Sequence, residues 1–258
     1  DIKTTEVPDW LSYSLMVVGL GSRLIYSMAV SDYSFILYGL AGFVIFVALG
    51  FIMYYGKQWG GGDCKLLMGL GALYGTGPSF VSFNWPFLLV LLINLLIVGA
   101  VYGLIWTLVL MFKNFRKFRK EFGKYNKGFK FSLIIFVVLV FMGVFMGSVL
   151  YGLALGGVFV VGILLLRMIR VVEKVCMYRR ESASLLVEGD WVGEEVKING
   201  KRVCGPSDLC LNKKQIQLLK KHNKKVLVKH GIPFVPSFFL ALVVTLVLGN
   251  LFQLVVMF

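Results

Sequence analysis

The chain has 258 residues, of which 58% are apolar or aromatic and 16% charged, and its mean hydropathy is +0.82. Soluble domains carry about 25% charged residues, so this composition argues against an ordinary soluble enzyme, and it argues equally against a disordered chain. Because 27 Lys and Arg face 13 Asp and Glu, the formal net charge is +14. A nucleic-acid-binding protein would share the basic excess but not the apolar content, so we expect no nucleic-acid partner. Sparse charge with a positive excess is typical of polytopic membrane proteins with basic loops on one side.

The sequence begins at Asp1 rather than Met, and no basic and then apolar signal segment follows. We therefore expect a further segment, including a first membrane span, to precede Asp1 in the full-length protein.

Membrane-spanning helices need about 20 mainly apolar residues, and six stretches meet that requirement. The stretch 64–79 is shorter and rich in glycine, which favours a shortened span packed inside the helical bundle. The connections at 31–33 and 150–151 are so short that their flanking spans must run antiparallel. The six predicted spans are 11–30, 33–55, 84–112, 131–150, 151–170 and 235–258.

Two polar regions interrupt the apolar pattern. Residues 113–130 hold eight Lys and Arg and one acid, and residues 171–230 hold thirteen Lys and Arg and seven acids. We interpret the first as a basic loop and the second as a small soluble α+β domain. In that domain Asn199-Gly200 predicts a β-hairpin, and Asn212 with Gln215 predicts a capped short helix.

Alternation of the spans places both basic regions on one side, and the positive-inside bias makes that side cytosolic. The predicted fold is therefore an all-α polytopic membrane protein, with about six to seven helices visible and a small cytosolic α+β domain. The expected parts are the membrane helices 1–112, the basic loop 113–130, a transmembrane hairpin 131–170, the soluble domain 171–230 and a last span 231–258.

Most familiar sets of catalytic or cofactor-binding residues are absent from this sequence. The four cysteines, at positions 64, 176, 204 and 210, show neither a disulfide framework nor paired zinc spacing. No zinc-protease helix, phosphate-binding loop or dinucleotide fingerprint is present. His222 and His230 both lie in the predicted soluble domain, and Cys64 has no activating base, so we interpret it as a packing residue. We expect neither a metal ion nor another cofactor.

Acidic residues beside membrane spans are costly and therefore candidates for function. Asp32 falls in an outer hairpin turn and is most simply a solvated cap. Asp63 directly follows Gly60-Gly61-Gly62 at the start of the short segment, where small residues allow a close approach of the backbone. Between Asp1 and Asp63 the chain crosses the membrane out and back, so both carboxyl groups are expected at the same membrane face.

Two carboxyl groups brought together in a poorly solvated place share a proton. One can then act as general base on a water molecule while the other donates a proton to the scissile carbonyl oxygen. The pair thus fits an aspartic protease, which needs neither a metal ion nor a nucleophilic side chain.

Two motifs carry a resemblance to a known family. Residues 1–9, DIKTTEVPD, resemble the D-x-(K/R)-x-x-x-(I/V)-P-(N/D) segment of type IV prepilin and preflagellin peptidases. Residues 60–67, GGGDCKLL, are similar to that family's G-x-G-D-x-K-L-L segment, in the same order and with two spans between them. The soluble domain followed by GIPFVPS and a last span is similar to the archaeal members. The chain lacks the Cys-x-x-Cys pairs of many bacterial members, which favours an archaeal-type enzyme that only cleaves.

The resemblance implies roles for particular residues. Asp1 and Asp63 would be catalytic, with Gly60, Gly62 and Lys65 as supporting motif positions.

The substrates implied are precursors of pilin-like proteins and archaellins, cut on the cytosolic side next to a hydrophobic helix. Glu6 and Asp9 would then meet the basic leader of the substrate, or else remain solvated loop acids. Lys65 would either favour the ionised form of Asp63 or extend to the membrane interface. Membrane lipids are the other expected partners.

Two alternatives stay open at this stage. A presenilin-type intramembrane protease also carries a G-x-G-D motif, although its other aspartate lies within a span and its last motif reads Pro-Ala-Leu, where this chain has Val-Pro-Ser. A non-enzymatic transporter or scaffold would need neither aspartate, and no internal repeat supports it.

Overall fold

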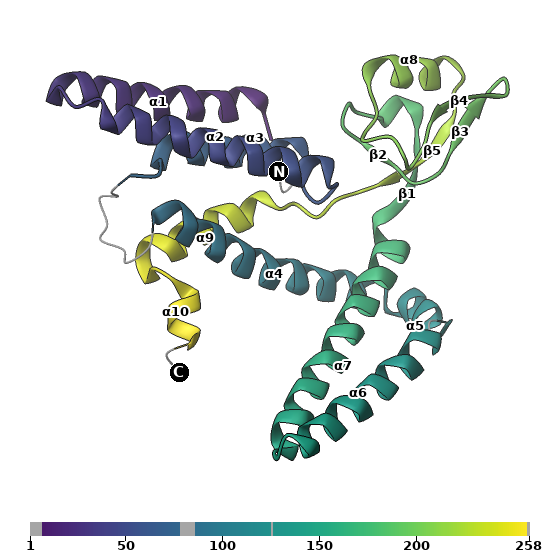
Figure 1. The fold of residues 1–258 in the computed structure, drawn as a ribbon. Coiled ribbons are helices and arrows are strands. Elements are labelled where there is room, and N and C mark those ends of the chain that lie inside the picture. The colour runs from purple at the N-terminus through teal and green to yellow at the C-terminus, as the bar shows by residue number, and fades with distance from the viewer. Residues whose placement is uncertain (1–6, 78–85, 125, 257–258) are drawn as a thin grey trace.

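The computed structural model describes residues 7–77, 86–124 and 126–256 (Figure 1). The elements of the helical part are α1 (Asp9–Val30), α2 (Ser34–Tyr55), α3 (Gly61–Tyr74), α4 (Phe87–Lys113), α5 (Phe115–Lys124), α6 (Asn126–Phe145), α7 (Val149–Val172), α9 (Val235–Leu248) and α10 (Leu251–Val256). Between α7 and α9 lie β1 (Tyr178–Ser182), β2 (Trp191–Val192), β3 (Val196–Ile198), β4 (Lys201–Cys204), α8 (Lys213–Lys221) and β5 (Lys225–Lys229).

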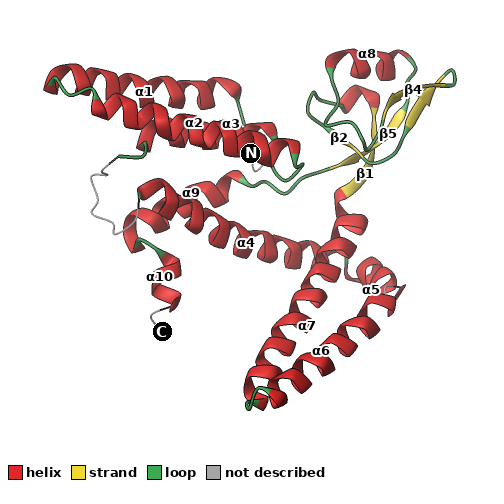
Figure 2. Ribbon diagram, in the orientation of Figure 1, coloured by secondary structure: helices red, strands yellow, loops and turns green. Residues whose placement is uncertain are grey.

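The predicted fold class, a helical membrane protein with a small α+β domain, is confirmed. Four described helices are long and apolar enough to cross a membrane, namely Asp9–Val30, Ser34–Tyr55, Phe87–Lys113 and Val149–Met177. Figure 2 shows the strands gathered in one small region, while the rest of the described chain is almost entirely helical.

Close packing of small residues joins α1, α2 and α3. A β-carbon at Gly42 of α2 would lie 2.6 Å from the carbonyl oxygen of Gly71 in α3, so the two backbones touch. On α1, Gly19 faces Leu73 in the same way, at 2.8 Å from its backbone nitrogen. Without side chains between them, helices gain van der Waals contact that lipid cannot replace. The glycine-rich stretch 64–79 thus contributes Gly71 to the close packing of α3 against α2.

Arg23, near the far end of α1, explains why α3 can stop short. Its guanidinium donates to the carbonyl oxygens of Leu73 (3.0 Å) and Tyr74 at the end of α3, and to that of Phe35 in α2 (3.1 Å). The last carbonyl groups of a helix have no partner within the helix, and a cation there also complements the helix dipole. Arg23 thus closes a helix of 14 residues, about 21 Å long.

The C-terminal span is broken, which corrects the prediction of a single helix over 235–258. Helix α9 ends at Leu248, Gly249 has φ 73°, and α10 begins at Leu251. Fully buried Asn94 of α4 provides hydrogen bonds to the backbone groups that are freed at this break. Its amide group donates to the carbonyl oxygen of Gly249 at 2.7 Å, and its oxygen accepts from the N–H of Leu251 at 3.1 Å.

Three other boundaries differ from the prediction. The short segment predicted at 64–79 is helix α3, and it begins three residues earlier, at Gly61, because Asp63 caps its first turn. The hairpin of α6 and α7 turns at 146–148 instead of 150–151, closed by a bond from the N–H of Ser148 to the carbonyl oxygen of Gly143. The basic region 113–130 contains the helix α5, not only a loop.

We call residues 178–230 the small domain; it starts later than the predicted 171, because α7 and a π-helical turn continue to Met177. Its strands pair in the order β1-β5-β2, and β3 and β4 form a separate hairpin. That hairpin turns at Asn199-Gly200, both with positive φ, as predicted. The predicted cap of α8 is also confirmed, because Asn212 and Gln215 exchange hydrogen bonds of 2.9 Å.

In Figure 1 the small domain lies on the side where α1 and α3 begin and where α2 and α4 end. The hairpin of α6 and α7 extends away from α1–α4. The loop between α2 and α3 therefore lies between the helical part and the small domain.

Candidate active site

Asp63 lies in the first turn of α3, directly after the three glycines. Its Oδ2 accepts a hydrogen bond from the N–H of Gly60 at 3.2 Å, so the carboxyl group caps the helix that follows it. A negative charge at this end of a helix is favourable, because free N–H groups and the helix dipole point towards it. The sequence folds locally in this way because Gly60 is extended, with ψ 160°, and lets the chain turn into α3.

Burial has the opposite effect on this carboxyl group. It raises the pKa of Asp63 from 3.8 to about 6, and the bond from Gly60 offsets only part of that rise. Asp63 thus lies at the edge of the apolar segment with a pKa raised towards neutral. A carboxyl group with a pKa close to neutral can both hold and release a proton under physiological conditions, as general acid–base chemistry requires.

The chain that precedes α1 runs against the same turn. A β-carbon at Gly62 would lie 3.0 Å from both Cβ and Cγ2 of Val7, so a side chain at position 62 would displace Val7. Gly62 is therefore a point of close approach between the two motif segments. Asp1 and Glu6, two predicted site residues, lie outside the described residues.

Lys65 and Asp9 form an ion pair across α1 and α3. The Lys65 ammonium lies 2.5 Å from Oδ1 of Asp9 and 5.5 Å from the ring centre of Tyr13. The ion pair is only partly buried, with side-chain exposures of 32% and 62%. Lys65 therefore has Asp9 as its anionic partner, and this contact was not foreseen from the sequence.

Trp59, just before the glycines, packs against the start of α9. Its ring centre lies 5.9 Å from that of Phe234 and 5.5 Å from that of Phe238. These contacts bring the G-x-G-D segment next to the chain around the GIPFVPS sequence, although Trp59 and Phe234 are 175 positions apart.

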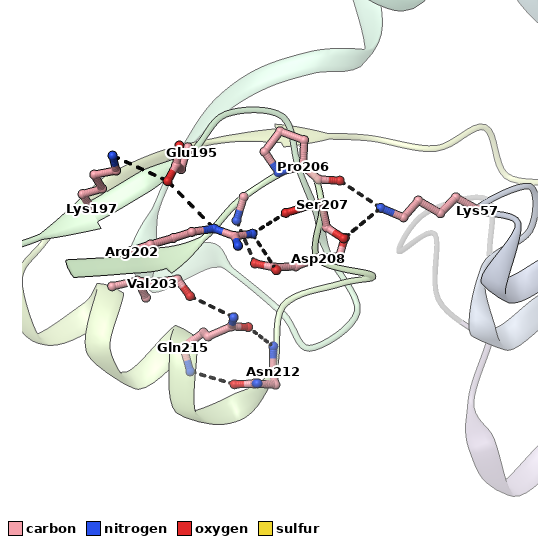
Figure 3. Close-up of polar contacts among 11 residues, drawn as sticks. Lys57, Glu195, Lys197, Arg202, Val203, Pro206, Ser207, Asp208, Asn212 and Gln215 are labelled. Atoms are coloured by element: carbon pink, nitrogen blue, oxygen red, sulfur yellow. Dashed lines mark hydrogen bonds and ion pairs between the residues drawn. The ribbon is translucent and has the colours of Figure 1, made fainter.

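The small domain contacts the same loop (Figure 3). The Lys57 ammonium donates to the carbonyl oxygens of Pro206 (2.8 Å) and Asp208 (3.0 Å). At the end of α2, the hydroxyl of Tyr54 lies 3.5 Å from Sγ of Cys210.

The contacted loop also has polar contacts of its own within the small domain. Arg202 lies 2.7 Å from Oδ1 of Asp208, and Oδ2 of Asp208 accepts from the N–H of Gly205 at 2.9 Å (Figure 3). Lys57 therefore meets carbonyl groups whose position the small domain fixes. No pattern in the sequence around Lys57 pointed to this contact, because its partners are about 150 residues away.

The other residues considered in the sequence, Asp32 and Cys64, have structural explanations. Oδ1 of exposed Asp32 accepts from the N–H of Ser34 at 2.9 Å, the predicted cap of an outer turn. Cys64 is 3% exposed and packs near Gly50 and Met68. Within residues 7–77, 86–124 and 126–256, no group of three or more His, Cys, Asp or Glu is placed to hold a metal ion.

Comparison with known proteins confirms the resemblance for the N-terminal part. Residues 1–115 match the model of the type IV leader peptidase family. Over 73 residues, 28% of this chain, the sequence is 38% identical to the preflagellin peptidase of Methanococcus maripaludis and 37% identical to that of Methanocaldococcus jannaschii, and each match covers 31% of the relative. It is 26% identical over 153 residues to the prepilin peptidase EppA of Methanothermobacter thermautotrophicus, covering 54% of this chain and 39% of the relative. No solved structure matches the chain significantly.

Proposed function

We propose that this protein is a membrane-embedded aspartic endopeptidase that removes the leader peptide from pilin-like or archaellin precursors. Asp1 and Asp63 would form its catalytic pair at the cytosolic face of the membrane. The observation that carries the proposal is the partly buried Asp63 carboxyl, with its pKa raised to about 6, in a motif turn against which Val7 packs. The match to the type IV leader peptidase family over residues 1–115 supports it.

Covalent geometry allows the two aspartates to meet. Six peptide units link Asp1 to Val7, which corresponds to about 20 Å of fully extended chain. Val7 in turn touches Gly62, the residue before Asp63. A bend in the connecting segment is enough to bring the Asp1 carboxyl beside that of Asp63.

The proposed chemistry uses one shared proton. The ionised carboxylate of the pair takes a proton from a water molecule as the water attacks the scissile carbonyl carbon. The protonated carboxyl donates to the carbonyl oxygen, which gives a neutral tetrahedral diol. The diol collapses as the first carboxyl passes its newly acquired proton to the departing amine nitrogen and the second carboxylate takes a proton from a diol hydroxyl, which restores the shared proton. The raised pKa of Asp63 suits it to hold the shared proton before attack.

Charge supports the proposed orientation and substrate class. Eight bases in 113–130 and thirteen in 171–230 favour the cytosolic side for the small domain and for the α2–α3 loop it contacts. On that side a basic leader would find Asp9, whose side chain is 62% exposed. Because Asp9 already pairs with Lys65, a substrate lysine or arginine would compete with Lys65 for it.

The test is precursor processing in membranes. Full-length protein is co-expressed with a pilin-like precursor, and the size of the precursor is followed by electrophoresis. We expect Asp1→Asn and Asp63→Asn each to reduce cleavage at least about a hundredfold, whereas the matched control Asp32→Asn leaves it unchanged. Continued processing by the Asp63→Asn variant would show that the proposed pair is wrong.

The same experiment separates the two alternatives. A presenilin-type protease would need its second aspartate within a span, so Asp1→Asn would leave its activity intact. A transporter or scaffold would leave the precursor uncut in every variant. The position of Asp63 in the first turn of α3 favours cleavage at the membrane surface rather than mid-bilayer.

A further inference from the structure

The short helix α5 has two contrasting faces. Phe118 is only 8% exposed and packs in one cluster with the fully buried Val171 and Val172 at the end of α7. On the other side the basic side chains Arg116, Lys117, Arg119 and Lys120 are exposed. An amphipathic helix of this kind, with aromatic residues on one face and bases on the other, lies flat in a membrane interface.

Four bases of this face have no ion-pair partner in the described part of the chain. The acid of α5, Glu121, is already shared between Lys124 at 2.6 Å and Lys174 at 3.2 Å. The charges of Arg116, Lys117, Arg119 and Lys120 are therefore not neutralised within the described chain, and they face outwards together.

An apolar hollow of about 320 Å³ lies against the aromatic face of α5, opposite the bases. Phe118 and Phe122 of α5 form one wall, Met111 of α4 another, and Leu165 and Met168 of α7 a third. Helices α4 and α7 are both long and apolar enough to cross a membrane, so two of the three walls belong to candidate membrane spans.

Arg167 of α7 holds the two walls together. Its guanidinium lies 4.0 Å from the ring centre of Phe122 and donates to the carbonyl oxygen of the same residue. A cation over an aromatic face combined with a hydrogen bond fixes α5 on α7. The hollow is therefore a built feature of the junction between α4, α5 and α7.

We propose that this junction binds an anionic glycerophospholipid, with an acyl chain in the hollow and the phosphate group on the bases of α5. The apolar walls exclude a soluble anion from the hollow, and the four unpaired bases favour an acidic headgroup over a zwitterionic one. A basic peptide is repelled by the same four charges. This site is independent of the proposed peptidase activity.

The test measures lipid retention by native mass spectrometry. The intact protein in detergent is mixed with equal amounts of phosphatidylglycerol and phosphatidylcholine. We expect wild-type protein to retain phosphatidylglycerol on the order of tenfold more than phosphatidylcholine, and an excess of inorganic phosphate to leave that preference unchanged.

Two variants with equal charge loss identify the site. Replacement of Arg116, Lys117, Arg119 and Lys120 by Gln is expected to abolish the preference. Replacement of Lys213, Lys214, Lys220 and Lys221 of α8 by Gln is expected to leave it intact.

A third variant tests the hollow itself. Leu165→Phe fills part of its volume, so retention of phosphatidylglycerol should fall while the four bases remain. The proposal is overturned if the α5 and α8 variants lose the preference equally, if inorganic phosphate displaces the lipid, or if wild-type protein retains both lipids alike. Circular dichroism and gel filtration of each variant establish that it is folded.

Discussion

The partly buried carboxyl of Asp63 is expected to lower the stability of the fold as the pH rises. Its pKa is about 6 in the folded protein, against 3.8 without burial, so the folded state holds this proton more tightly than the unfolded state does. The stabilisation that protonation gives is therefore complete below pH 3.8 and is lost as the pH rises through about 6. Above that pH the charged carboxylate is buried at a net cost.

The magnitude follows from the difference between the two pKa values. At pH 8 the raised pKa lowers the free energy of unfolding by about 3 kcal/mol relative to a protein with Asp63 uncharged, because each pKa unit corresponds to about 1.4 kcal/mol. At pH 4 ionisation of Asp63 lowers the free energy of unfolding by less than about 1 kcal/mol.

The substitution Asp63→Asn removes the charge, keeps the shape and retains an oxygen that can accept from Gly60. We therefore expect this variant to be more stable than wild type by about 3 kcal/mol at pH 8 and nearly equal to it at pH 4. Thermal unfolding in detergent, followed by circular dichroism from pH 4 to 8, measures the difference. The matched control is Asp32→Asn. A hydrogen bond from Ser34 holds the pKa of exposed Asp32 below its usual value, so the Asp32 charge stabilises the fold. Removal of that charge therefore cannot make the protein more stable at pH 8. Equal stability of Asp63→Asn and wild type at pH 8 would refute the reasoning.

Three further predictions concern the framework of the site. Arg23→Met leaves the carbonyl groups at the end of α3 unpaired, and thermal unfolding should show a loss of about 3 kcal/mol; an unchanged midpoint would contradict the proposed cap. Gly42→Ala places a β-carbon 2.6 Å from a carbonyl oxygen of α3 and should cost about 1–3 kcal/mol, whereas Gly21→Ala, which meets nothing within 4 Å, should not destabilise the protein. Lys57→Met should speed hydrogen exchange in the loop between β4 and α8, while Lys213→Met should not; identical exchange in both variants would argue against this contact.

Local signals in the sequence were sufficient for part of the fold. Asn199-Gly200 predicted its hairpin because both residues tolerate positive φ, and Asn212 with Gln215 predicted the start of α8. The connection at 31–33 predicted an antiparallel pair of helices, because three residues are too few to lead the chain back across the membrane. In each case the residues that decide the structure lie next to one another in the chain.

Contacts between distant residues decide what the sequence did not reveal. The break at Gly249 depends on Asn94, a partner 155 positions away. Helix α5 was predicted as a loop because its charges dominate the composition, although Phe118 and Phe122 are spaced for a helix. In the candidate site, Asp63 was recognisable from its motif, whereas the contact of Lys57 with the small domain has no local signature.

The position of Asp1 relative to Asp63 tests the account most directly. With the four native cysteines replaced by serine, the pair Asp1→Cys and Asp63→Cys is treated in membranes with a short bifunctional thiol reagent. The pair Val7→Cys and Gly62→Cys, whose parent residues touch in the structure, is the positive control, and Asp32→Cys with Asp63→Cys is the negative one. If Asp1 and Asp63 form the catalytic pair, positions 1 and 63 will be cross-linked as readily as the positive control. Cross-linking of the positive control alone would contradict a catalytic pair formed by these two residues.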